Sequence, residues 1–333
     1  MKAIIYTEYG NPDVLKVQDM PKPVPKDGEV LVKVHAVAVN FGDIMARNFI
    51  YISAKEFNMP LLLWLFAKLA FGIRKPRIKV LGNSFSGEIE SDGRKGFQLQ
   101  KGEPVFGYTG EKMGGYAEYV CLPSKGIIAS KPSIVSFAQA AALPYGSLVA
   151  INLLKKIKIS KGQKVLVVGA SGSIGSATIQ LLRNHFGAVV SGVCRSERMD
   201  YVKRLGVETV FDYEKGNYAQ DNETYDIIID VLGKGSFSGY KSILKPDGTC
   251  IYASFKTLKL LQMLWTRLTG NRKVRCILTS ASVDDLVLIK KLVEEGKITA
   301  VIDRSYPFEK ASDAHAYYES HCSHGDVIVT FQK

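Results

Sequence analysis

The fold is indicated most clearly by residues 164–196, which read KVLVVGASGSIGSATIQLLRNHFGAVVSGVCRS. Its first five residues, Lys164–Val168, are apolar and mostly β-branched, which is typical of a buried parallel strand. A glycine-rich turn follows, and then a helix expected over 177–186 and a second strand over 188–193. A strand, a glycine-rich turn, a helix and a strand at this spacing predict a dinucleotide-binding βαβ unit.

The glycine-rich turn is predicted to hold a pyrophosphate. A small residue at 170 allows a tight turn, Gly172 lets the backbone approach the phosphates, and Gly175 lets the helix pack closely on the strand. The helix N-terminus offers N–H groups and a positive dipole to the phosphates. The residues assigned to this cradle are Ala170, Ser171, Gly172, Ser173, Ile174 and Gly175.

The end of the second strand decides which cofactor is expected. An NAD-binding unit places Asp or Glu there for the ribose hydroxyls, whereas this chain reads Cys194-Arg195-Ser196. Arginine at this point predicts a site for the 2′-phosphate of NADP(H), with the Ser196 hydroxyl as a second donor. Tyr213, after the next expected strand, is assigned to the adenosine. Glu197 supports the alternative, a carboxylate on the ribose.

Composition narrows the class of protein. A chain of 333 residues with 46% hydrophobic and 23% charged residues is typical of a soluble globular protein with two domains. No signal peptide precedes the first expected strand, so a cytoplasmic location is predicted. The cysteines are scattered and form no CxxC pair, which excludes a disulfide framework and a zinc knuckle. They are Cys121, Cys194, Cys250, Cys276 and Cys322.

The net charge of +12 is high for an enzyme and admits three partners: nucleic acid, an anionic membrane surface or an anionic cofactor. No helix-turn-helix, RNA-binding sheet motif or basic helix is visible, so no nucleic-acid partner is expected. A generally basic, solvated surface explains most of these charges.

The chain changes character near residue 126. Before it, short strands alternate with turns, and Val30–Val39 has the period-two pattern of an antiparallel strand, which indicates a partly open β-barrel. After it, strands alternate with helices. The expected helices include 136–142, 148–156, 237–244 and 284–295. The further expected strands are 2–6, 81–89, 115–121, 209–212, 226–231, 249–253 and 327–331.

Several separated motifs carry a family resemblance that covers nearly the whole chain. They include MKAIIYTEYGNPDVL at 1–15, VKVHAVAVNFGD at 32–43, GNSFSGEI at 82–89, GGYAEYVCLP at 114–123 and GVCRSERMDYVKRLGVETVFDY at 192–213. With these motifs the chain resembles the zinc-free branch of the medium-chain dehydrogenase/reductase superfamily, the quinone oxidoreductase and zeta-crystallin-like enzymes.

The resemblance implies an α/β fold in which a Rossmann, doubly wound parallel sheet is inserted in a partly open, GroES-like β-barrel. Residues 1–123 and 281–333 would form the catalytic domain and residues 124–280 the NADP-binding domain. Leu232 and Gly233, after the strand expected over 226–231, join the cofactor-binding residues. The family also implies a small-molecule substrate, an active site in the interdomain cleft and a homodimer.

The resemblance also allows the zinc positions to be compared one by one. The metal-dependent branch holds its catalytic zinc with a cysteine, a His-Glu pair and a later cysteine. This chain has Asn40 at the first position and Asn83-Ser84 at the pair, and zinc prefers Cys, His or carboxylate ligands. No catalytic metal is therefore expected. A second metal candidate, His321-Cys322-Ser-His324, is interpreted as a polar loop.

Two stretches depart from the family: LLLWLFAKLAFGIRKPRIK at 61–79 and TLKLLQMLWTRLTGNRKVR at 257–275. Each joins an apolar run to a cluster of cations. The first run is too short to span a bilayer and contains Lys68. The favoured interpretation is a wall over a lipophilic substrate pocket, formed in part by Leu62, Trp64 and Phe66. A dimer contact and a peripheral membrane anchor are the alternatives.

Without zinc, reduction of a quinone or a conjugated C=C fits better than alcohol oxidation. Asn40 is assigned as an amide donor to the developing oxyanion, or alternatively as a turn residue. Tyr51 and Tyr145 are candidate proton donors or pocket walls. Asp43, expected to pair with Arg47, holds the loop.

The substrate itself stays open. Val149 stands where relatives commonly carry a threonine that faces the nicotinamide, and Asp326 replaces a common lysine. A zinc-free alcohol dehydrogenase-like enzyme and a nucleotide-binding, non-catalytic, crystallin-like protein are the alternative functions.

Overall fold

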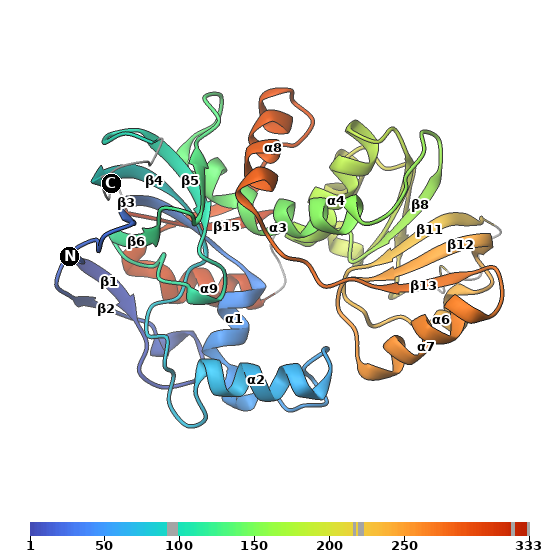
Figure 1. Ribbon diagram of the computed structural model, residues 1–333, viewed down its shortest axis with the longest axis horizontal. Coiled ribbons are helices and arrows are strands. Elements are labelled where there is room, and N and C mark those ends of the chain that lie inside the picture. Colours follow the sequence, from blue (N-terminus) through green and yellow to red (C-terminus); the bar gives the residue numbers. More distant parts are fainter. Residues whose placement is uncertain (92–98, 216–217, 219–222, 321–323, 332–333) are drawn as a thin grey trace. The chain divides into compact units, whose positions relative to one another are not determined.

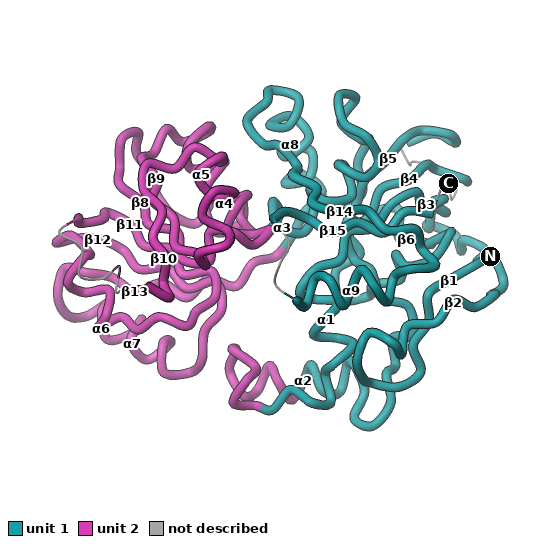
Figure 2. Tube along the Cα trace, turned by 180° about the vertical axis from the view of Figure 1, so that it is seen from behind, with its two compact units in different colours: residues 1–53, 66–148, 281–333 teal, residues 54–65, 149–280 magenta. Residues whose placement is uncertain are grey.

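The computed structural model describes residues 1–91, 99–215, 218, 223–320 and 324–331. The chain forms two compact units, which are distinguished in Figure 2. Unit 1 comprises residues 1–53, 66–148 and 281–333, and unit 2 comprises residues 54–65 and 149–280. Each unit has its own sheet and its own core.

Unit 2 is built on a six-stranded sheet in the order β10-β9-β8-β11-β12-β13, and all of its strand pairs are parallel. This is the doubly wound sheet expected from the sequence. The strand order reverses between β8 and β11, where this class of sheet binds its ligands. The strands are β8 (Lys164–Val168), β9 (Val189–Cys194), β10 (Thr209–Asp212), β11 (Tyr225–Asp230), β12 (Leu244–Tyr252) and β13 (Lys273–Cys276).

Helices cover both faces of this sheet. α4 (Ser173–Asn184) packs on β8 and β9, and Figure 1 shows it on one side of the sheet with α6 and α7 on the other. α4 begins four residues before the expected start at 177, because its first turn is formed by the glycine-rich segment itself. The remaining helices are α5 (Met199–Arg204), α6 (Phe237–Tyr240) and α7 (Thr257–Leu268).

Unit 1 is built around β3 (Glu29–Val39), which is almost wholly buried and pairs with three other strands. Its sheet has the order β14-β15-β3-β4-β5-β7, with β6 paired to β3, and β1 and β2 form a separate antiparallel pair. This is the β-rich domain expected from the sequence. The other strands are β1 (Lys2–Ile5), β2 (Lys16–Asp19), β4 (Ser84–Ser91), β5 (Pro104–Tyr108), β6 (Tyr119–Pro123), β7 (Ile127–Ser130), β14 (Ile302–Pro307) and β15 (Asp326–Thr330).

The helices of unit 1 include α1, which follows β3, and α8 and α9, which precede the last strands (Figure 1). α8 starts at a Ser282 cap whose hydroxyl accepts from the N–H of Asp285, and it ends before Gly296, as the amphipathic pattern predicted. The bounds are α1 (Phe41–Arg47), α8 (Val283–Glu294) and α9 (Ala311–Glu319). The apolar α2 (Leu61–Phe71) has no buried residue and crosses from unit 2 into unit 1.

α3 (Phe137–Lys155) is one helix of 19 residues, so the expectation of two helices over 136–142 and 148–156 was wrong. Pro144 lies inside it and removes one helical hydrogen bond. The Ser84 hydroxyl donates to the carbonyl of Ala141 at 2.8 Å and accepts from the N–H of Tyr145 at 3.3 Å. A hydroxyl from β4 thus bridges the two backbone groups beside the proline, and the helix continues.

These contacts also explain where the units divide. The unit boundary falls after Leu148, later than the 123/124 division expected from the sequence, and the return at 281 coincides with the expected one. β7 pairs with β5, and the Ser86 hydroxyl donates to the carbonyl of Phe137, so both elements belong to unit 1. α3 is long and apolar enough to cross a membrane, but 72% of that stretch is buried inside the protein.

Candidate active site

The turn after β8 has the tight geometry expected, but a different residue provides it. Gly169 adopts φ +87°, the left-handed conformation that glycine adopts without strain, whereas Ala170 is fully buried. A side chain at Gly169 would meet Leu232 at 3.0 Å, and one at Gly192 would meet the Ala170 methyl at 3.0 Å. Gly169 is thus the left-handed residue of the turn, and the small Ala170 packs beneath it.

Gly172 and Gly175 differ in the space around them. A Cβ on Gly175 would lie 2.1 Å from the carbonyl oxygen of Gly169 and 2.9 Å from the Cα of Ala170, so helix and strand meet there in direct backbone contact. A Cβ on Gly172 would meet nothing closer than 3.8 Å. Gly172 is the N-cap of α4 and provides no side-chain cap, so the open space lies at a helix N-terminus.

Arg195 and Tyr213 meet at the ends of β9 and β10. The Arg195 Nε–H donates to the Tyr213 hydroxyl at 2.7 Å, and the same nitrogen lies 3.6 Å from a carboxylate oxygen of Glu214. Both side chains are partly exposed, and Glu197 is exposed on the short 3-10 helix that follows. The Ser196 hydroxyl donates to the carboxylate of Asp212, which holds the pKa of that carboxyl below its usual range.

Two further residues lie at this edge of the sheet. The Cys194 thiol is buried, which raises its pKa to about 11 and keeps it neutral. Arg198, which the sequence analysis did not select, donates to the hydroxyl of Ser171 in the glycine-rich turn at 3.4 Å. A signal was present, because a cation three residues after Arg195 on a helical turn falls on the same side.

The loop after β11 faces the glycine-rich turn across the point where the strand order reverses. Asp230 is fully buried, and its carboxylate accepts from the N–H groups of Gly233 at 2.7 Å and Gly235 at 2.8 Å. Gly233 adopts φ +65°, and a side chain there would meet the carbonyl oxygen of Ser254 at 1.8 Å. Leu232 is half exposed beside Gly169. Asp230 therefore fixes the loop that carries both predicted residues.

A cavity of about 630 Å³ opens within unit 2 beyond the carboxyl ends of β12 and β13, the edge at which α/β sheets bind ligands. Its walls come from α7, from the start of α2 and the residue before it, from the end of β13, and from residues that follow α3, β12 and β13. Most of the lining is apolar. The lining residues are Pro60, Leu63, Lys156, Phe255, Leu260, Met263, Arg275, Cys276, Ile277 and Leu278.

In unit 1 the three positions compared with zinc ligands carry neutral side chains that are already hydrogen-bonded. The Asn40 amide donates to Oδ1 of Asn83 at 2.6 Å, and its own Oδ1 accepts from the N–H of Gly42 at 2.9 Å. Asn40 is 1% exposed and is the N-cap of α1. Two roles were considered for Asn40, a turn residue and an amide donor to the oxyanion. The structure contains the contacts of the first role, because Asn40 caps α1.

Asp43 completes this cap from a fully buried position. Its carboxylate accepts from the N–H of Asn40 at 3.0 Å and from the N–H of Gly82 at 2.8 Å. Burial raises the pKa of Asp43 to about 7, although the two N–H groups and the nearby Arg47 charge oppose the shift. Asp43 thus holds the loop before β4 against α1, as expected.

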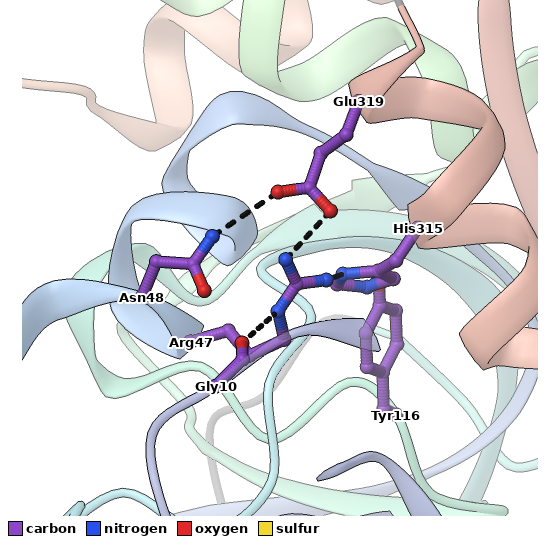
Figure 3. A network of polar contacts seen from close by, with 6 residues as sticks. All are labelled: Gly10, Arg47, Asn48, Tyr116, His315 and Glu319. Atoms are coloured by element: carbon purple, nitrogen blue, oxygen red, sulfur yellow. Dashed lines mark hydrogen bonds and ion pairs between the residues drawn. The ribbon is translucent and has the colours of Figure 1, made fainter. Parts of the chain in front are cut away.

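The pairing expected between Asp43 and Arg47 needs correction, because the Arg47 guanidinium lies in a different network (Figure 3). It donates to Glu319 at 2.6 Å, to Nδ1 of His315 at 3.0 Å and to the carbonyl of Gly10 at 3.0 Å. An arginine always donates, so His315 accepts at Nδ1 and donates from Nε2 to the Tyr116 hydroxyl, 2.9 Å away. Burial and the Arg47 charge hold the pKa of His315 well below its usual range.

The two candidate tyrosines lie in different settings. Tyr145 follows Pro144 in α3, with its ring 6.4 Å from that of Tyr108, and burial raises the pKa of its hydroxyl well above the usual range. Tyr51 is 69% exposed at the end of a 3-10 helix, Phe49–Tyr51. The structure therefore groups Tyr145 with the buried Asn40, Asn83 and Ser84 set through the Ser84 hydroxyl, and Tyr51 stands apart from it.

Among the residues that the structure describes, no group of three or more His, Cys, Asp or Glu side chains is arranged to hold a metal ion. The His321-Cys322 part of the second metal candidate lies outside the described residues.

The comparisons with known proteins agree with this architecture. Residues 26–133 match the model of the alcohol dehydrogenase GroES-like domain, and residues 205–329 match that of the zinc-binding dehydrogenases. The mouse (Mus musculus) quinone oxidoreductase is 30% identical over 95% of this chain and 93% of its own length. The chloroplastic NADPH-dependent alkenal/one oxidoreductase of Arabidopsis thaliana is 29% identical over 99% of this chain and 79% of its own.

A solved structure of the quinone oxidoreductase from Coxiella burnetii superposes with a TM-score of 0.83 at 27% identity, over 100% of this chain and 99% of that one. A GroES-like domain joined to a parallel Rossmann sheet defines a medium-chain dehydrogenase/reductase. Within that superfamily, this chain belongs to the quinone oxidoreductase family of oxidoreductases.

Proposed function

We propose that this protein is an NADPH-dependent reductase that transfers hydride to a quinone or an α,β-unsaturated carbonyl compound without a catalytic zinc ion. The observation that carries the proposal is the arginine and tyrosine pair at the ends of β9 and β10, where an NAD-dependent enzyme would present a carboxylate. The relatives described above are named as quinone and NADPH-dependent alkenal/one oxidoreductases.

The glycine-rich turn fits the cofactor. The open space at Gly172 lies at the first turn of α4, where the N-terminal N–H groups and the helix dipole favour a pyrophosphate. Arg198 contacts Ser171 in this turn and Arg195 follows β9, and either guanidinium suits a 2′-phosphate. We propose that the pyrophosphate is held by the glycine-rich turn, Ala170, Ser171, Gly172, Ser173, Ile174 and Gly175. The adenosine phosphate would be surrounded by Cys194, Arg195, Ser196 and Tyr213. The remainder of the cofactor would be bordered by Leu232 and Gly233.

The proposal that zinc is dispensable rests on the side chains at the ligand positions. Asn40, Asn83 and Ser84 offer amide and hydroxyl groups, which zinc rarely uses. The Asn40 amide oxygen, the Asn83 amide oxygen and the Ser84 hydroxyl all have partners within unit 1. Asp43 is the nearest carboxylate, and both its oxygens accept backbone N–H groups. This donor set does not fit a zinc ion.

When bound, NADPH supplies the hydride, so the protein must orient the acceptor and stabilise the charge that develops on its oxygen. We assign two residues of unit 1 to that task. Asn40 retains one amide hydrogen beyond the one given to Asn83, and it is the donor for the oxyanion. Tyr145 is protonated at neutral pH, and we assign it as the proton donor. Tyr51 is the alternative donor, accessible from solvent.

The proposed acceptor is lipophilic, because the cavity in unit 2 is walled by aliphatic and aromatic side chains such as Phe255, Leu260 and Ile277. Its cations, Lys156 and Arg275, favour a carbonyl or an anionic group at one end of such a molecule. The stretch at 257–275 therefore supports the pocket-wall interpretation through the inner side of α7.

The test is a cofactor-by-substrate screen that pairs NADPH and NADH with quinones, short and long 2-alkenals, and simple alcohols. We expect NADPH consumption with quinones or alkenals, faster with the longer chains and unchanged by a zinc chelator. Turnover of simple alcohols would instead indicate an alcohol dehydrogenase-like enzyme. NADPH binding without any turnover across the panel would indicate a non-catalytic, crystallin-like protein and overturn the proposal.

We also propose that the protein is a homodimer in the cytoplasm, as its family resemblance led us to expect. The supporting observation is β13, which ends the six-stranded sheet with one edge unpaired by any other described strand. Light scattering on the purified protein tests the oligomeric state.

A further inference from the structure

α7 is apolar on two sides. Its inner side places Leu260 and Met263 in the wall of the cavity. Its outer side exposes five large apolar residues, each more than half accessible, with Leu268 at 85%. Because most of them are three or four residues apart, they share one side of the helix. We call these residues the α7 face, and they are Leu258, Leu261, Leu264, Trp265 and Leu268.

The α7 face lies in the most basic part of the chain. No acidic residue occurs between Asp247 and Asp284, whereas six cations do. A second acid-free stretch, between Glu56 and Glu88, contains five more. The two stretches therefore account for eleven of the twelve net positive charges of the chain. The six cations around α7 are Lys256, Lys259, Arg267, Arg272, Lys273 and Arg275.

The positive charge around α7 is not neutralised by carboxylates in the contacts that the structure describes for these residues. Lys259 donates to the carbonyls of Gly233 and Gly235 and lies 3.7 Å from the centre of the Tyr252 ring. Arg272 donates to the carbonyl of Leu244, and Lys273 donates to the carbonyls of Thr266 and Gly270. Neutral carbonyls orient these side chains without cancelling their charge, so the surroundings of the helix stay cationic.

An apolar helix side among uncompensated cations matches the interface of an anionic bilayer. Leucines enter the boundary between headgroups and acyl chains, tryptophan lies at headgroup level, and each nearby cation adds about 1 kcal/mol of attraction to anionic lipid. A second copy of this chain is a poorer partner, because a symmetric contact through α7 would bring two sets of like charges together. The chemistry of the surface thus favours anionic lipid.

We propose that α7 docks this protein on the surface of an anionic membrane, with the α7 face buried in the interface and the exposed cations Lys256 and Arg267 against the headgroups. A consequence, which rests on the proposed function, concerns the substrate. Leu260 and Met263 line the cavity from the other side of the same helix. A lipophilic acceptor dissolved in the bilayer would then reach the cavity mouth without crossing bulk water.

The test is flotation of the full-length protein with vesicles of phosphatidylcholine alone or mixed with phosphatidylglycerol. We expect binding to the mixed vesicles, weak binding to phosphatidylcholine, and a steep loss of binding as salt is raised. The triple variant Leu261→Ser, Trp265→Ser, Leu268→Ser should bind the mixed vesicles at least about tenfold more weakly. These residues do not line the cavity, so its turnover of a water-soluble acceptor should match that of the wild type.

The matched control removes exposed apolar residues elsewhere. Val24, Ile134 and Val287 are at least half exposed and lie in unit 1, so their replacement by serine should leave vesicle binding unchanged. Equal binding to both kinds of vesicle, or an unaffected triple variant, would overturn the proposal. So would a wild type that ignores vesicles but loses an oligomeric state in the triple variant, because α7 would then be a protein interface. Vesicle binding without turnover in the substrate screen would retain the docking surface and remove the proposed reaction.

Discussion

Gly172 and Gly175 are three residues apart in one motif, yet the structure separates their roles. An alanine methyl at 175 would collide with the backbone of Gly169 and Ala170, and we expect Gly175→Ala to lower the free energy of unfolding by about 3 kcal/mol. Gly172 has an ordinary φ of −80° and open space around it, so Gly172→Ala should leave stability within about 0.5 kcal/mol of the wild type.

The same Gly172→Ala variant should raise the Kd for NADPH at least about tenfold, because the methyl occupies the space proposed for the pyrophosphate. Urea unfolding and fluorescence titration with NADPH measure the two effects on the same samples. If Gly172→Ala bound NADPH like the wild type, the phosphate cradle would have to be placed elsewhere.

Arg195 is the residue that we propose selects NADPH over NADH. Arg195→Ala should raise the KM for NADPH about 10- to 100-fold, the range expected for loss of a charge-assisted hydrogen bond to phosphate, and leave the KM for NADH nearly unchanged. Arg204→Ala, at the exposed end of α5, is the matched control and should change neither constant. An equal increase in KM for NADPH and NADH would show that Arg195 binds a part of the cofactor that the two molecules share.

Individual residues also show which structural features can be predicted from a sequence and which cannot. The glycine-rich turn was predictable because glycine spacing directly reflects backbone geometry, and its left-handed residue is Gly169. The role of Asn40 was not predictable in this way. An asparagine after a strand is compatible with a cap and with a catalytic donor, and only the contacts to Gly42 and Asn83 show that the cap is formed.

At the scale of elements, α1 and α9 are joined by the buried Arg47 network of Figure 3. Glu319→Gln removes the anion and leaves the fully buried guanidinium unpaired, so the free energy of unfolding should fall by about 2–4 kcal/mol. The control is Glu295→Gln, which breaks an exposed pair with Lys297 and should cost about 0.5 kcal/mol or less. Equal losses in urea unfolding would mean that burial of Arg47 contributes nothing.

Helices and strands were predicted accurately where a single hydrophobic periodicity dominates the sequence. The strand over 209–212 was placed to the residue, and α8 to within one residue at each end, because alternation and caps leave little choice there. α3 shows the limit of this reasoning. Two helices were expected on either side of Pro144, but a hydroxyl from β4, 57 and 61 residues away from its two partners in the chain, bridges the flanking backbone groups. No local window contains that information.

At the scale of the whole molecule, Asp43 and His315 give stability opposite pH dependences. The folded state raises the pKa of Asp43 from 3.8 to about 7, so between these values it binds more protons than the unfolded state. Stability from this group therefore falls as pH rises from about 4 to 7. His315 has a lowered pKa, so its contribution is lost as pH falls below its ordinary value of 6.5.

In mildly acidic solution, Asp43 and His315 change the free energy of unfolding with pH in opposite directions. The Asp43→Asn variant should remove only the contribution of Asp43. We expect this variant to lose stability on acidification more steeply than the wild type between pH 6.5 and 4, by up to about 1.4 kcal/mol per pH unit. Urea unfolding across that range measures the difference. Parallel pH profiles for the two proteins would contradict the raised pKa of Asp43.

The polar side chains of Asn40, Asn83 and Ser84 are also part of the structure of unit 1. Asn40 caps α1, and Ser84 bridges α3 beside its proline, so the scaffold has come to depend on the side chains that stand where a metal would be held. Installing cysteine, histidine and glutamate there would uncap one helix and interrupt another before any ion could bind. Building a zinc site at these positions would therefore require compensating changes in both helices.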